Sequence, residues 1–171
     1  MNNYLASSTF DSAKQRNHQQ ATQSLHLIVF DIGNLKLAVP IQFTYKVANY
    51  SSVHGSGLNH MGVTHVDNLE ITVVDLHRRL FKSDQTDEFS PDNCLVIVQN
   101  SMGELCGVPS ANAPTLMEVP LSMIRALPPS YRRSDTLDIA SHVAVIPQAS
   151  STLTLFLLDV DQLLSSSLKL Q

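Results

Sequence analysis

The sequence has no tryptophan, only two cysteines and few charged residues. Charged side chains make up 15% of its 171 residues, whereas soluble domains usually approach a quarter. The formal net charge is −4, so we expect no nucleic-acid partner, because nucleic-acid recognition begins from clustered Lys and Arg and from aromatic faces. A hydrophobic content of 43% with so little charge instead predicts apolar surface that a partner protein covers.

Long hydrophobic runs and a secretory leader are also missing. No apolar stretch approaches the roughly 20 residues that cross a bilayer, and the first residues lack a basic-then-apolar pattern. We therefore expect a cytoplasmic protein without direct membrane insertion. In a reducing compartment Cys94 and Cys106 should be free, buried thiols, with a disulfide as the alternative.

Two stretches of the chain read as copies of one another. Residues 27–40 and 95–109 each contain an apolar run, a polar turn with Gly, and a second run closed by Val-Pro. This pattern predicts two β-hairpins. Each half later has an apolar strand that runs into an aspartate, Asp75 or Asp159, where helix capping explains the carboxylate more simply than acid catalysis does. The sequence predicts a mainly β, pseudo-duplicated chain with a groove between two lobes.

Composition sets the expected boundaries. Residues 1–24 are rich in Asn, Gln and Ser and are predicted to be a flexible tail. The folded part spans 25–164, as subdomains 25–93 and 94–164, and residues 165–171 form a C-terminal tail. Short helices are predicted at 75–81 and 161–164. The second arm of the first hairpin should run on to Ile41, on the same face as Val39.

Histidines suggest a competing function. Four of the seven lie between residues 54 and 77, namely His54, His60, His65 and His77. Their spacing fits no zinc motif, so we expect no metal, no cofactor and no catalytic residues. The alternative is a small metal-dependent β-barrel enzyme that uses the His-rich loop at residues 51–65, and metal analysis of the purified protein would separate the two.

Two basic doublets, Arg78-Arg79 and Arg132-Arg133, stand out in an otherwise acidic chain. A solvated face is the expected location for each, since exposed charges seldom do more. Docking to an acidic partner surface is the alternative.

Residues 62–76 read Gly-Val-Thr-His-Val-Asp-Asn-Leu-Glu-Ile-Thr-Val-Val-Asp-Leu. This stretch resembles the CheW family, in which it commonly reads G-V-x-N-L-R-G-x-I-I-P-V-V-D-L. Both hairpins, Glu118-Val119-Pro120 and the closing residues 155–164 agree in order, so the resemblance covers about 25–164. It implies two five-stranded SH3-like β-barrels packed together, with short helices.

In function, the resemblance implies a non-catalytic adaptor in a chemotaxis-like pathway, with surface motility or phototaxis among its outputs. The implied partners are the regulatory domain of a CheA-type histidine kinase and the cytoplasmic tip of methyl-accepting chemoreceptors. Receptor arrays would then bring the protein to the membrane. Weak self-association through the kinase-binding surface is a further expectation.

The chain departs from the family pattern at two charges. The family's Arg is Asp67 here, its Gly is Asn68, and the Glu of an earlier V-x-E-I segment is Lys46. Because both charges change sign, we predict a reversed ion pair between Lys46 and Asp67, with two unrelated surface changes as the alternative.

The partner-binding surface of the first half is expected at six positions. Val39 and Ile41 could equally be core residues, since alternation along a strand requires one buried face, and Gly62 could be an ordinary turn glycine. The expected residues are Val39, Ile41, Lys46, Gly62, Val66 and Asp67.

Overall fold

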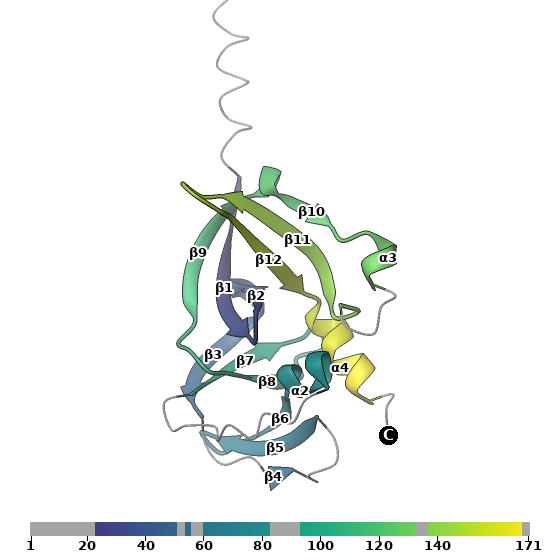
Figure 1. Cartoon of the computed structure of the whole chain (residues 1–171). Coiled ribbons are helices and arrows are strands. Elements are labelled where there is room, and N and C mark those ends of the chain that lie inside the picture. The colour runs from purple at the N-terminus through teal and green to yellow at the C-terminus, as the bar shows by residue number, and fades with distance from the viewer. Residues whose placement is uncertain (1–22, 51–53, 56–59, 83–92, 133–136, 169–171) are drawn as a thin grey trace, which may run out of the picture.

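The computed structural model describes residues 23–50, 54–55, 60–82, 93–132 and 137–168. Within these residues the strands form two sheets of six (Figure 1). Sheet A has the order β10-β11-β12-β2-β1-β9, and sheet B has the order β3-β7-β8-β6-β5-β4. The predicted mainly β fold with few, short helices is confirmed. None of the helices in these residues is long and apolar enough to span a membrane.

Sheet A contains β1 (Ser24–Ile32), β2 (Leu35–Pro40), β9 (Thr115–Pro120), β10 (Ile124–Ala126), β11 (Ala140–Pro147) and β12 (Thr152–Leu158). Sheet B contains β3 (Thr44–Asn49), β4 (His54–Gly55), β5 (Met61–Val66), β6 (Leu69–Val74), β7 (Cys94–Gln99) and β8 (Leu105–Ser110). The helices are α2 (Leu76–Phe81), α3 (Pro129–Arg132) and α4 (Val160–Leu168), with single 3₁₀ turns η1 (Ile41–Phe43) and η2 (Leu121–Met123).

Each half of the chain contributes a hairpin to the other half's sheet. The β1–β2 hairpin joins β12 through parallel pairing, with Leu37 opposite Phe156. The β7–β8 hairpin joins β6 in the same way, with Thr72 opposite Cys106. The expected division of the chain after residue 93 therefore does not follow the sheets. A tight turn is visible in a sequence, whereas parallel pairing needs a long crossover that leaves no local signal.

The two hairpins are buried on both faces, which explains their uninterrupted apolar runs. Buried side chains of the described residues form one cluster inside each sheet and a larger one between the sheets. β1 and β2 supply Leu27, Val29 and Ala38 to the interior of sheet A, and β7 supplies Leu95 and Ile97 to the interior of sheet B. Their alternate residues enter the central cluster: Phe30, Ile32, Leu37, Val39, Val96 and Val98.

Helices α2 and α4 cover the central cluster where the two sheets meet (Figure 1). Each begins directly after the last strand of its half. The Asp75 carboxylate accepts from the Arg78 amide at 3.0 Å, and the Asp159 carboxylate accepts from the Gln162 amide at 3.0 Å. The prediction that these aspartates cap helices is confirmed.

Two predicted element ends are corrected. β2 ends at Pro40, which has no N–H to continue the ladder, and Ile41 begins η1 instead of sharing a face with Val39. The last helix extends to Leu168 and so includes part of the predicted C-terminal tail. β1 begins at Ser24, and the rest of the predicted N-terminal tail up to residue 22 lies outside the described residues.

Both cysteines are free thiols on the second hairpin. Cys94 lies opposite Ser110 and Cys106 lies opposite Val98, so the register does not pair them. Cys106 is fully buried, and this burial raises the pKa of its thiol to about 12. Cys94 is only half-buried, contrary to the expectation of two buried thiols.

Candidate partner-binding surface

The reversed ion pair lies at one end of the sheet B barrel. β3 is at one edge of sheet B, and the β5–β6 turn is near the other edge. The Lys46 amine nevertheless contacts the Asp67 carboxylate, so the sheet curls to bring its edges together. The predicted pair is confirmed. With Asp67 70% exposed, it should add only about 0.2–1 kcal/mol to stability, and its main effect is on the charges a partner meets.

Asp67 and Asn68 form the two-residue turn between β5 and β6. Val66 pairs with Leu69, and the two central residues have φ values of 51° and 65°. Left-handed backbone at both positions is the geometry of a type I′ hairpin turn. Asp and Asn tolerate this region better than other residues with a side chain, so Asn68 can stand where the family has Gly.

The structure places the predicted site residues in different environments. Val39 is fully buried in the central cluster, which removes it from the predicted surface, because the alternation of β2 turns it inward. Ile41 is 49% exposed. Val66 packs on the sheet B cluster beside Asp67, and Gly62 is half-buried in β5 opposite Val73.

The sequence reasoning missed an exposed apolar strip on β3. Burial alternates along this strand, so Tyr45 and Val47 face outward while Lys46 and Ala48 face the barrel. Together with Ile41 they form what we call the β3 strip, Ile41, Tyr45 and Val47. The alternation itself was the signal, but the segment is short and was not predicted as a strand.

A pocket of about 350 Å³ opens where the two sheets meet, and we call it the junction pocket. Its walls are mostly apolar and come from sheet A, the 3₁₀ turns η1 and η2, and the start of α4. The β7–β8 turn of the other sheet closes one side with Asn100 and Ser101. The apolar lining residues are Leu25, Pro40, Phe43, Leu121, Ile124, Leu157, Leu158 and Val160.

The side of the pocket formed by the β7–β8 turn is held by hydrogen bonds. The Asp161 carboxylate accepts from the Ser101 amide at 2.9 Å and from its hydroxyl at 2.8 Å. Both bonds lower the pKa of Asp161, and the bond from the Ser101 backbone amide has the larger effect. The Asn100 side-chain oxygen accepts from the Met102 and Glu104 amides at 3.0 and 2.8 Å. The turn therefore meets α4 in a fixed conformation.

The histidines that suggested a metal site lie on different elements. His54 is in β4, and the Nε2 atom of His65 in β5 lies 3.8 Å from Glu70 Oε2. His77 in α2 packs against Phe81, with ring centroids 4.8 Å apart and the ring planes tilted by 43°. The described part of the chain contains no group of three His, Cys, Asp or Glu side chains suited to hold a metal ion. Residues 51–53 and 56–59 of the His-rich loop are outside that part.

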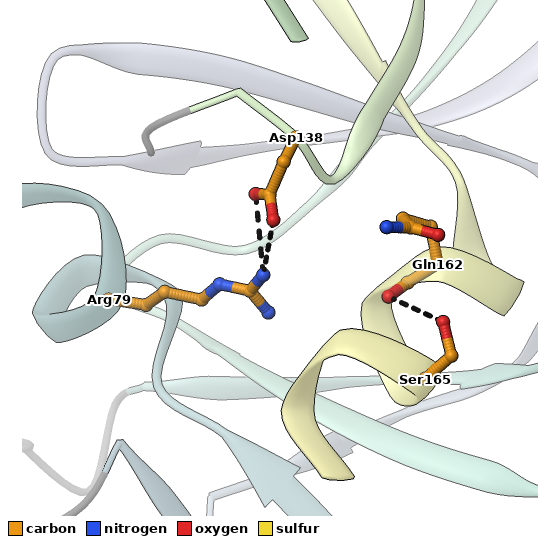
Figure 2. A network of polar contacts seen from close by, with 4 residues as sticks. All are labelled: Arg79, Asp138, Gln162 and Ser165. Atoms are coloured by element: carbon orange, nitrogen blue, oxygen red, sulfur yellow. Dashed lines mark hydrogen bonds and ion pairs between the residues drawn. The ribbon is translucent and has the colours of Figure 1, made fainter. Parts of the chain in front are cut away.

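Arg79 does not lie on a solvated face. Its side chain is 8% exposed, and its Nη2 atom contacts Asp138 Oδ2 at 3.0 Å and Oδ1 at 3.3 Å. Figure 2 shows the guanidinium reaching from α2 to the segment before β11, with α4 drawn alongside and its Ser165 hydroxyl donating to the Gln162 carbonyl. The ion pair ties the helix of one half to the other half.

Comparison with known proteins assigns the chain to a family. A search of the curated proteins finds no match. Among solved structures, the fold is similar to that of the scaffolding protein TtCheW from Thermoanaerobacter tengcongensis. The two are 15% identical with a TM-score of 0.65, and the match covers 81% of this chain and 86% of that one. This likeness confirms the predicted pair of SH3-like barrels. The CheW-like domain matches residues 26–168, and the chain therefore belongs to this family of non-catalytic chemotaxis scaffolds.

Proposed function

We propose that this protein is an adaptor that couples chemoreceptors to a CheA-type histidine kinase by binding both. Family membership supports the adaptor class. The observation that carries the proposal of a kinase contact is the β3 strip, where three large apolar side chains are exposed on adjacent elements beside a charged pair. A partly apolar patch with a polar border is the usual composition of a protein interface.

The kinase contact is proposed to include Ile41, Lys46, Gly62 and Asp67, with Val66 packed beside the turn that carries Asp67. Val39 supports the surface from inside the core and does not itself touch the partner. The β3 strip supplies the apolar area, and the reversed charges supply partner selection. Like charges at a contact discriminate strongly, so a kinase suited to the usual Arg would be disfavoured at Asp67.

The receptor contact is proposed at the junction pocket. Its apolar walls and its position where the two sheets meet suit an amphipathic helix that inserts one or two apolar side chains. The proposed role is to bind and orient two partners, which requires no bond to be made or broken. No described residue is therefore given a catalytic role.

Titration of the purified protein with the regulatory domain of its cognate kinase tests the kinase contact. We expect Val47→Asp to raise the Kd at least tenfold, which corresponds to about 1.4 kcal/mol, because a charge would be buried in the contact. Val145→Asp is the matched control, since Val145 is similarly exposed, at 47% against 42% for Val47, but lies on β11 of sheet A. Equal effects of the two substitutions would contradict the proposed surface.

A further inference from the structure

We propose that the N-terminal segment of this chain occupies the junction pocket, with Phe10 as its apolar anchor and Lys14 and Arg16 at the acidic rim. The segment would then compete with the receptor helix for one pocket. Its binding to the pocket stands independently, whereas the competition depends on the proposed function.

The first support is where the described chain begins. The Gln23 carbonyl accepts a hydrogen bond from the Leu121 amide at 2.9 Å. Leu121 lines the junction pocket, and so does Leu25, two residues after Gln23. Whatever precedes Gln23 is therefore attached directly at the wall of the pocket.

The second support is reach. Twelve residues lie between Phe10 and Gln23, and the thirteen steps from one Cα atom to the other span up to about 43 Å at 3.3 Å per residue. A pocket of about 350 Å³ is only several ångströms across, so the tether allows Phe10 to fold back into it. Because the segment is covalently attached through a short linker, its effective concentration at the pocket should be on the order of millimolar, at which even weak docking is populated.

The third support is chemical complementarity. The pocket walls are mostly apolar, and Phe10 has the largest purely hydrocarbon side chain among the first 22 residues. Asp159 and Asp161 lie at the pocket, and the hydrogen bonds from Ser101 favour the ionised form of Asp161. Lys14 and Arg16 follow Phe10 at a distance that lets an anchored aromatic ring place cations near these carboxylates. A second copy of the chain would lack this built-in tether.

A paramagnetic label in the full-length protein tests the docking directly. Ser7→Cys would carry the label in a Cys94→Ser background, because Cys106 is fully buried with a raised thiol pKa and should not react. We expect line broadening at the methyl groups of Leu121 and Ile124 in the pocket. The methyl groups of Ile71 and Ile97, inside the sheet B barrel, should keep their intensity.

Substitutions in the same labelled chain decide between specific docking and chance encounters. Phe10→Ser should remove most of the broadening, and Lys14→Glu with Arg16→Glu should reduce it further at low salt. Leu5→Ser is the control and should change little. Broadening that is absent, spread equally over both sheets, or unaffected by Phe10→Ser would overturn the proposal.

A second titration separates this inference from the proposed function. With a peptide of the cognate receptor tip as the probe, we expect Phe10→Ser to tighten binding severalfold because a competitor is removed. If the label shows docking but the peptide binds equally to both proteins, the receptor contact lies elsewhere and the tail docking stands. If the label shows no docking, the tail proposal fails whatever the peptide does.

Discussion

At the scale of single residues, the exchanged charges of Lys46 and Asp67 change the surface of the sheet B barrel without changing the fold. Asp67 is 70% exposed and Lys46 is 38% exposed, so water screens the pair and their attraction is small compared with the core. The turn that carries Asp67 keeps its left-handed backbone because Asp and Asn tolerate it. The charges visible to a partner are therefore free to change while the barrel stays the same.

A double-mutant cycle over Lys46→Glu and Asp67→Arg tests this separation of stability from selection. The coupling energy in urea unfolding should be below about 1 kcal/mol, because an exposed pair contributes little. The double variant should shift the Kd for kinase regulatory domains at least tenfold, about 1.4 kcal/mol, towards those suited to the usual polarity. Unchanged partner preference would remove the role proposed for the pair.

His60 gives the stability a dependence on pH. Burial first, and then the nearby Arg79, lowers the pKa of His60, and its buried Nε2 atom has no hydrogen-bond partner among the residues that the structure describes. Below its ordinary pKa near 6.5 the unfolded chain binds this proton more readily than the folded one, so stability should fall as the pH drops from 7 to 5. His60→Gln should make the unfolding free energy less steep over that range, and an unchanged slope would exclude His60 as the cause.

At the scale of elements, the same junction is used twice, with a strand ending at an aspartate that caps the next helix. Asp159→Ala should lower the free energy of unfolding by about 1 kcal/mol, since the first turn of α4 would lose its cap. Asp159→Asn is the control, because Asn caps almost as well and should restore most of the loss. Urea denaturation measures both, and equal losses would indicate a role for the negative charge itself.

Gly107 of the second hairpin has no room for a side chain. A Cβ added there would lie 2.9 Å from Leu95 Cδ1, and Leu95 is enclosed in the sheet B cluster. Gly107→Ala should cost about 1–3 kcal/mol of unfolding free energy through overpacking. Adding Leu95→Val should recover part of that loss, and a Gly107→Ala protein of full stability would show that the core yields easily.

The sequence predicted the elements with strong local signals. Both hairpins and the capped helices follow from turn residues and aspartates. Strand β3 was missed because its alternation is short, and Ile41 was misplaced because nothing local shows that Pro40 starts a 3₁₀ turn. The partners of the hairpins depend on contacts far apart in the chain.

Part of the candidate site could also be predicted from the sequence. The Lys46–Asp67 pair followed from two departures from a family pattern and not from spacing. A groove between two lobes was predicted, but the residues that line the junction pocket could not be named, because they come from segments between residues 25 and 161 that only the fold brings together. Arg79 read as surface, since a sequence does not show that Asp138 meets it.

At the scale of the whole molecule, the exchanged hairpins and the Arg79–Asp138 ion pair join the two sheets into one body. Arg79→Ala should lower the unfolding free energy by about 2 kcal/mol, because it leaves Asp138 partly buried without its cation. Arg132→Ala, on an exposed residue of α3, is the control and should change it by less than about 0.5 kcal/mol. Similar losses in both variants would show that the ion pair adds nothing particular.

The hairpin exchange also limits how the chain can be divided. Since each sheet contains strands from both sides of residues 83–92, cleavage there would yield two pieces that each lack the neighbours of their own hairpin. Neither piece should fold when expressed by itself, yet the two pieces expressed together should assemble into the native fold. The parallel pairing of β2 with β12 and of β6 with β8 would hold the two pieces together. The protein could therefore be used as a split reporter, in which folding signals that the two pieces have met.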